Sequence, residues 1–193
     1  MSKLKPAERE QQFARLFHFL QQQGFDVPIE TISKATGIMS RTLYNRYHDK
    51  DSLIREILRY WRVNFSEQFN IKRHYCNNAI EELLLFIHDL KQEYRASPFF
   101  FQREYRAGCF FQPGTDRFMD MITCLLRENK NKDIFLPSLN EDDYALFFLF
   151  NIVNGIVREN LTENTCIFVL RAALSNEGCL NLQTLLPVSF VRG

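Results

Sequence analysis

Three short segments of helical periodicity, separated by single glycines, occupy the first fifty residues and constrain the fold more than any other feature. In the first segment the apolar residues recur at intervals of three, one and three, on one helix face: Phe13, Leu16, Phe17 and Leu20. Gly24 then suits a C-terminal stop, and Pro28 can open the next helix in its first turn. Gly37 ends the second segment, as a tight turn requires.

The third segment, residues 39–47, has an apolar side and a polar, basic side. Leu43 and Tyr47 are four residues apart, so in a helix they face inward together. The residues left toward solvent or a ligand are Arg41, Thr42, Tyr44 and Asn45. Arginine can fork onto guanine and asparagine onto adenine, whereas hydroxyls suit phosphate oxygens. The three segments together predict a helix-turn-helix with a recognition helix at about 39–47.

Residues 13–58 resemble the DNA-binding domain of TetR-family transcriptional regulators. The matching residues, in order, are Gly24–Phe25, then Ile29, Ile32, Ala35 and Gly37, then Thr42–Leu43–Tyr44 with Tyr47, and finally Lys50, Asp51 and Leu53. Two positions depart from the family pattern. Met39 stands where the family usually has a capping Ser or Thr, and Arg41 replaces a small residue.

The resemblance implies a ligand-responsive regulator, expected to be a repressor, that binds a palindromic double-stranded operator as a homodimer. Its DNA-contacting residues would be Ser40, Arg41, Thr42, Tyr44, Asn45, Arg46, Tyr47, His48 and Lys50. By the same resemblance, Thr42, Tyr44 and Lys50 would contact the phosphate backbone. Arg41 and Asn45, one turn apart, are expected to read bases.

Charge is distributed unevenly along the chain. Residues 1–73 contain thirteen Lys or Arg and eight Asp or Glu, whereas residues 74–193 contain eleven and fifteen. A basic N-terminal part in a nearly neutral protein is consistent with a polyanionic partner bound locally, although the excess is modest and also suits a solvated face.

The remaining residues are expected to form helices, which gives an all-α fold with a DNA-binding domain at 1–50 and an effector-binding and dimerisation domain at 51–193. Nineteen Phe and seven Tyr against seven Gly and six Pro favour long helices around bulky side chains. Helical spacing or helix-breaking residues place these helices at 51–73, 77–95, 116–129, 141–159 and 163–175.

The segment Tyr144–Val153 is apolar on nearly every face, so it must be covered on several sides. The family resemblance implies that the last two helices pair with those of a second subunit. We therefore expect a dimer interface formed by Phe148, Phe150, Ile152, Val153, Phe168 and Leu170. A pocket for a small apolar or aromatic effector is expected among aromatic residues: Trp61, Phe99, Phe100, Phe101, Tyr105, Phe110, Phe111, Phe118 and Phe147.

Other function classes have less support. The sequence contains no Gly-rich phosphate loop, GxSxG or HExxH motif, so we expect no catalytic residues, metal or cofactor. Five scattered cysteines without paired spacing suggest incidental thiols. A polar N-terminus and no long apolar run favour a cytoplasmic location without membrane contact. The alternative is a helical interaction or scaffold protein that uses the helix-turn-helix without sequence-specific DNA binding.

Overall fold

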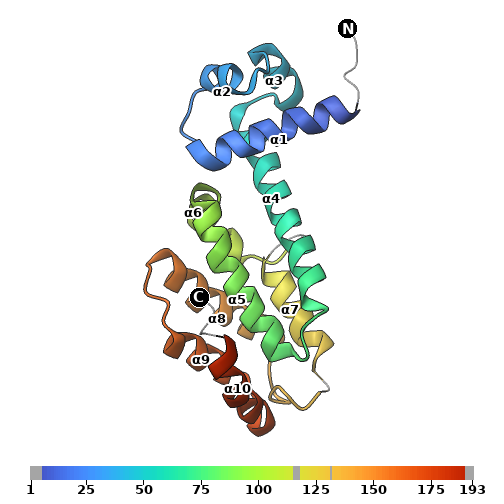
Figure 1. Ribbon diagram of the computed structural model, residues 1–193, viewed down its shortest axis with the longest axis vertical. Helices are drawn as coiled ribbons and strands as arrows, with labels where there is room; N and C mark the ends of the chain where they lie inside the picture. The colour runs from blue at the N-terminus through green and yellow to red at the C-terminus, as the bar shows by residue number, and fades with distance from the viewer. Residues whose placement is uncertain (1–5, 115–117, 131, 190–193) are drawn as a thin grey trace.

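The computed structural model describes residues 6–114, 118–130 and 132–189. Its N-terminal part, which we call the head, consists of three helices (Figure 1): α1 (Pro6–Gln23), α2 (Ile29–Thr36) and α3 (Ser40–Tyr47). The three helices lie at the intervals expected from the apolar spacing. Helix α4 (Lys50–Arg73) leaves the head and runs along one side of the remaining part, so the two parts share one long helix.

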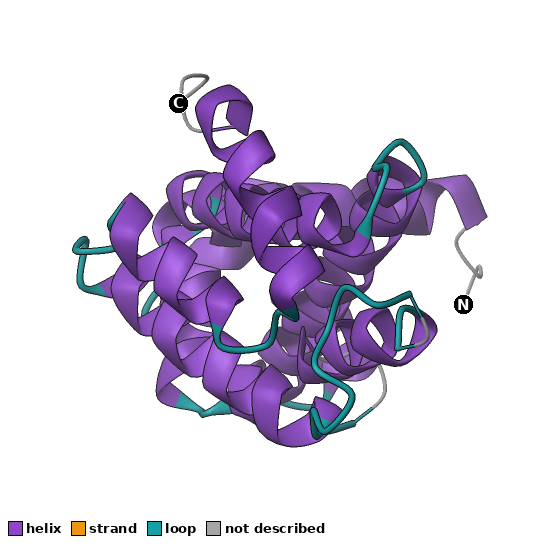
Figure 2. Cartoon of the chain, turned by 90° about the horizontal axis from the view of Figure 1, so that it is seen from below, coloured by secondary structure: helices purple, strands orange, loops and turns teal. Residues whose placement is uncertain are grey.

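The second part, which we call the body, continues with further helices, of which α5, α6 and α7 pack against α4. Their bounds are α5 (Ala79–Ala96), α6 (Pro98–Arg106), the short 3-10 helix η1 (Cys109–Phe111), α7 (Phe118–Glu128), α8 (Glu141–Val157), α9 (Glu163–Arg171) and α10 (Asn176–Ser189). Within the described residues there is no strand, only an isolated bridge between Phe135 and Leu174 (Figure 2). The expected all-α fold is confirmed. None of the described helices is long and apolar enough to span a bilayer.

Side-chain caps fix where several body helices begin. Asn78 accepts hydrogen bonds from the backbone N–H groups of Ile80 and Glu81 at the start of α5. Asn140 does the same for α8, and the hydroxyl of Thr162 accepts from Thr165 at the start of α9. These caps bring the observed helix starts within about two residues of the predicted ones, which is the usual scatter of such boundaries.

Two boundaries near the C-terminus differ from expectation. The helix predicted at 163–175 ends at Arg171, and a further helix, α10, follows at Asn176–Ser189. Gly178 lies inside α10 because the helix approaches the backbone of Ile134 closely: a Cβ at Gly178 would be 2.2 Å from that carbonyl oxygen. A glycine inside a helix normally argues against one, so the sequence signals α10 only weakly.

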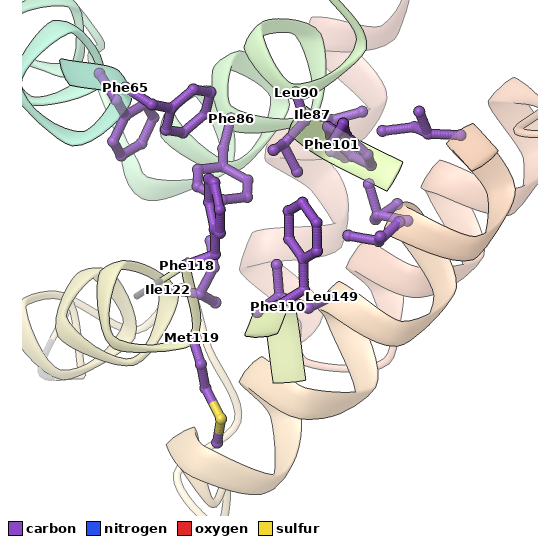
Figure 3. Packing of buried hydrophobic residues seen from close by; sticks show 14 of the residues in the cluster. Phe65, Phe86, Ile87, Leu90, Phe101, Phe110, Phe118, Met119, Ile122 and Leu149 are labelled. Atoms are coloured by element: carbon purple, nitrogen blue, oxygen red, sulfur yellow. The ribbon is translucent and has the colours of Figure 1, made fainter. Parts of the chain in front are cut away.

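Aromatic rings from α4, α5, α6, η1 and α7 fill the centre of the body (Figure 3). The ring of Phe118 stacks on Phe110 with centroids 4.5 Å apart and meets Phe65 edge-on at 5.2 Å. Phe101 contacts Phe110 at 4.6 Å, and Phe86 lies 5.7 Å from Phe65. Such offset and edge-on contacts are the favourable arrangements of aromatic pairs, so the body has a packed aromatic core.

Head and body are in direct contact through α6. The ring of Phe25, just after α1, stacks on Phe100 at 5.2 Å, and Phe17 meets the same ring edge-on at 5.2 Å. Phe17 also contacts Tyr60 of α4 at 5.3 Å. The buried apolar residues consequently form one continuous cluster from head to body, so the two parts are mechanically linked.

Candidate nucleic-acid interface

A tight turn between α2 and α3 sets the angle at which α3 leaves the head. Gly37 ends α2 with φ 68°, the left-handed conformation that glycine adopts without steric cost. Ile38 follows and is buried, which anchors the turn to the core of the head. The Thr36 hydroxyl donates a hydrogen bond of 2.7 Å to the Ile32 carbonyl, so the last turn of α2 is also held.

Helix α3 is oriented by two buried residues on one side. Leu43 is 1% exposed and Tyr47 is 3% exposed, so the prediction that they face inward together is confirmed. The opposite side is open to solvent and carries the side chains of Arg41, Tyr44, Asn45 and Arg46. Ser40 and Thr42, at the start of the helix, are half-buried. The exposed side of α3 therefore offers guanidinium, amide and phenol groups together.

The N-terminus of α3 begins without a side-chain cap. Met39 occupies the cap position, makes no capping hydrogen bond and is 74% exposed. The backbone N–H of Thr42 bonds to the Met39 carbonyl at 2.8 Å, so the helix starts at Ser40 despite the missing hydroxyl. Uncapped N–H groups at a helix start favour an anion, because they carry the positive end of the helix dipole.

The turn from α3 to α4 places a further cation, Lys50, three residues after the end of α3. His48 has φ 64°, an uncommon conformation for a residue with a side chain, and its side chain is exposed. Asp49 caps α4 by accepting a 2.6 Å hydrogen bond from the Ser52 N–H, and this bond lowers the pKa of its carboxyl group. Lys50, half-buried, is the first residue of α4.

Tyr47 is buried, unlike the other residues predicted to contact DNA. Burial raises the pKa of its phenol, an effect that the neighbouring Arg46 partly offsets. The Arg46 guanidinium lies over the Tyr47 ring, 5.7 Å from its centroid. Tyr47 thus helps to place Arg46, while its own side chain belongs to the core of the head.

The residues predicted for a dimer interface fall into two groups. Phe150 of α8 and Phe168 of α9 are 57% and 67% exposed, whereas the other four side chains lie inside the single chain, with no exposed surface: Phe148, Ile152, Val153 and Leu170. Sequence periodicity could not separate the groups, because α8 is apolar on both sides. Leu146 and Phe147, which were not predicted for the interface, are also exposed on α8.

The residues predicted to line a ligand pocket are not brought together around one cavity. Five of them form the aromatic core and are almost fully buried: Trp61, Phe100, Phe101, Phe110 and Phe118. Tyr105 donates a 2.6 Å hydrogen bond to Asn154 of α8, and Phe111 contacts the ring of Phe150 at 5.8 Å. Phe99 and Phe147 are exposed on different helices. For the five buried residues the aromatic character is explained by packing in the core, which sequence alone does not separate from ligand contact.

Titratable groups elsewhere in the described residues do not assemble into a metal site: no group of three or more His, Cys, Asp or Glu side chains could hold an ion. The five cysteines are unpaired.

Comparisons with known proteins find similarity at the level of structure. No protein-family model matches the chain, and no curated protein matches it in sequence. The FadR regulator of Bacillus subtilis, solved in complex with stearoyl-CoA, has a TM-score of 0.65 and 12% identity, and the match covers 86% of this chain and 98% of that one. A TetR-family regulator from Pectobacterium atrosepticum has a TM-score of 0.62 and 14% identity over 95% and 96% of the two chains.

The TetR-family protein CprB from S. coelicolor is similar to the same degree, with a TM-score of 0.64, 12% identity and coverage of 94% and 96%. These matches extend over head and body together. The chain thus has the all-α fold of TetR-family transcriptional regulators.

Proposed function

We propose that the protein is a transcriptional regulator that binds DNA through α3. The observation that carries this proposal is the two-sidedness of α3, whose inner side is fixed by Leu43 and Tyr47 while its outer side presents Arg41, Tyr44 and Asn45 to solvent. An exposed recognition helix of this kind enters the major groove with its first residues toward the bases.

The chemistry of the α3 side chains assigns them two roles. Arg41 and Asn45 are one turn apart and both exposed, so they can reach neighbouring base pairs. Thr42, Tyr44 and Lys50 supply hydroxyl and ammonium donors for phosphate oxygens. The uncapped start of α3 adds backbone N–H groups that can bind a DNA phosphate.

A homodimer would present two recognition helices to one palindromic site. Support comes from the surface of α8 and α9, where Leu146, Phe147, Phe150 and Phe168 are exposed. Exposed apolar side chains of this size on two helices that pack together are typical of protein interfaces. Two-fold pairing through this surface would double the contacts with DNA and impose two-fold symmetry on the operator.

The body, residues 51–193, is the proposed effector and dimerisation domain, and residues 1–50 are the proposed DNA-binding domain. Repression relieved by a small apolar or aromatic effector is the corresponding mode of action. The solved structure of the similar B. subtilis regulator contains stearoyl-CoA, which supports ligand control on this fold. The direct contact of Phe25 with Phe100 offers a route by which changes in the body would reach the head.

Selection of randomised DNA duplexes with the full-length protein tests the proposal. We expect enrichment of an inverted repeat whose half-sites lie about one helical turn apart or a multiple of it. Binding to the enriched duplex should weaken steeply with salt, because each neutralised phosphate adds about 0.9 to the logarithmic salt slope. Recovery of no shared sequence, or binding insensitive to salt, would favour the alternative of an interaction protein.

A further inference from the structure

A cleft of about 420 Å³ lies between the head and α6. Figure 1 shows α6 below the C-terminal end of α1, where the chain turns toward α2. The walls are formed by Phe25 and Asp26 of the head, by Phe99, Gln102, Arg103 and Arg106 of α6, and by Ala107 just after that helix. The volume falls within the range of about 300–1,000 Å³ that is usual for small-molecule sites.

Two guanidinium groups line the α6 side of this cleft. Arg103 and Arg106 are three residues apart on one helix, so their side chains leave the same face. Both are exposed, and among the described residues neither forms an ion pair with a carboxylate. Arginines with free guanidinium groups in a concave surface favour a ligand with phosphate oxygens, because the planar fork can bind them in pairs.

The cleft also contains an aromatic wall. Phe99 is 43% exposed, although one edge of its ring packs against Gly24, where an added Cβ would be 3.0 Å from a ring carbon. Phe25, on the opposite wall, is held by its stacking on Phe100. The exposed part of the Phe99 ring provides a flat apolar surface on which a planar ring can stack.

Asp26 adds a negative charge to the cleft, which a simple anion would not complement. Its exposed carboxylate lies on the head side, across from the arginines. A carboxylate repels phosphate but accepts hydrogen bonds from hydroxyl or amino groups. The walls together therefore favour a ligand with three distinct parts, namely a phosphate, hydrogen-bond donors and a planar ring.

We propose that this cleft binds a phosphorylated ligand with a planar ring and hydroxyl groups, of which a nucleotide is the simplest form. Arg103 and Arg106 bind its phosphates, the ring stacks on Phe99, and Asp26 accepts from its hydroxyls. The ligand would touch head and body at once, so its binding is linked to the position of the head. Only this effect on DNA rests on the proposed function; the binding itself does not.

Calorimetric titration of the full-length protein with ADP tests the site. Adenosine and pyrophosphate are the matched probes, because each carries only part of the recognised chemistry. We expect ADP to bind at least about tenfold more tightly than either, since hydrogen bonds to charged groups are stronger than neutral ones and each probe lacks part of the contacts. Trp61 is the only tryptophan and contacts Phe100 at 6.3 Å, so its fluorescence should change with ADP.

The double variant Arg103→Ala/Arg106→Ala should weaken ADP binding by at least about tenfold and leave adenosine binding unchanged. Arg95→Ala/Arg158→Ala, which removes two other exposed arginines, is the control for net charge and should bind ADP normally. No ADP binding at millimolar concentration, or equal effects of the two double variants, would overturn the proposal.

A parallel measurement of DNA affinity separates the two proposals. If ADP binds and alters the affinity for the selected duplex, the nucleotide site and the regulatory function are both supported. If ADP binds through Arg103 and Arg106 but no duplex is bound under any condition, the site stands and the proposed regulatory function fails. If ADP binds without changing DNA affinity, the link between cleft and head is wrong.

Discussion

The side-chain amide of Gln21 donates a 2.7 Å hydrogen bond to the hydroxyl oxygen of Ser97, which joins the last turn of α1 to the junction between α5 and α6. The Ser97 hydroxyl in turn donates to Glu93 at 2.8 Å, and the same carboxylate accepts from the indole N–H of Trp61 on α4. Head and body are thus connected by a polar chain beside the aromatic contacts of Phe25 and Phe100.

Loss of the hydrogen bond between Gln21 and Ser97 should lower the stability measurably. Gln21→Ala should lower the free energy of unfolding by about 1 kcal/mol, because a partly buried hydrogen bond contributes about that much net. Gln23→Ala, an exposed change on the same turn, should stay within about 0.5 kcal/mol of the wild-type value. Urea denaturation measures both, and equal effects of the two variants would show that the Gln21 contact does not stabilise the protein.

The exposed and buried phenylalanines of α8 should respond differently to a charge. Phe150→Asp should give a folded monomer, because the side chain is exposed in the single chain and lies on the proposed dimer surface. Phe148→Asp should prevent stable folding, since it places an unpaired carboxylate in the core. Light scattering and circular dichroism distinguish these outcomes. A wild-type monomer at micromolar concentration would contradict the dimer.

The reactivity of the cysteines should follow their burial. Burial raises the pKa of the Cys166 thiol to about 11, and burial together with Glu82 raises that of Cys76 to about 11. Both remain protonated near pH 8, and the thiolate is the reactive form. We expect iodoacetamide to modify exposed Cys124 first and Cys166 only after unfolding, as followed by mass spectrometry. Rapid alkylation of Cys166 in the folded protein would contradict its placement.

The cap formed by Asp49 should make stability depend on pH in a defined direction. Its folded pKa is lowered below the reference value of 3.8 by the hydrogen bond from Ser52, so its charge stabilises the fold above that value. This contribution is lost as the pH falls through the folded pKa. Asp49→Ser keeps a neutral cap. The stability difference between wild type and variant should therefore shrink as the pH falls below 3.8 and through the folded pKa, and a constant difference would refute the assignment.

The head was predictable from sequence because its signals are local. Helical spacing and two glycines place α1, α2 and α3, and the interval between Leu43 and Tyr47 identifies the inner side of α3. The missing cap at Met39 does not shift the helix, because its carbonyl still accepts the first backbone bond from Thr42. Local periodicity is enough to predict the position and the buried side of a helix when that helix has one apolar side.

The body was less predictable because its helices are apolar on more than one side. In α8 the spacing of apolar residues does not show that Phe148 faces the core and Phe150 faces solvent. The spacing also does not show that the rings of Trp61 and Phe118 contact each other at 5.7 Å. The cleft between Phe25 and Arg103 joins residues distant in the chain, so only the tertiary structure reveals it.

The sequence preference of an Arg41→Ala variant tests the central claim most directly. Fluorescence anisotropy should compare the selected operator with random DNA for wild type, Arg41→Ala and Lys50→Ala at fixed salt. We predict that Arg41→Ala narrows the affinity ratio by about tenfold, since a bidentate base contact contributes about 1–3 kcal/mol of discrimination. Lys50→Ala should weaken both duplexes alike and leave the ratio unchanged. An unchanged ratio in Arg41→Ala would contradict base reading by the exposed side of α3.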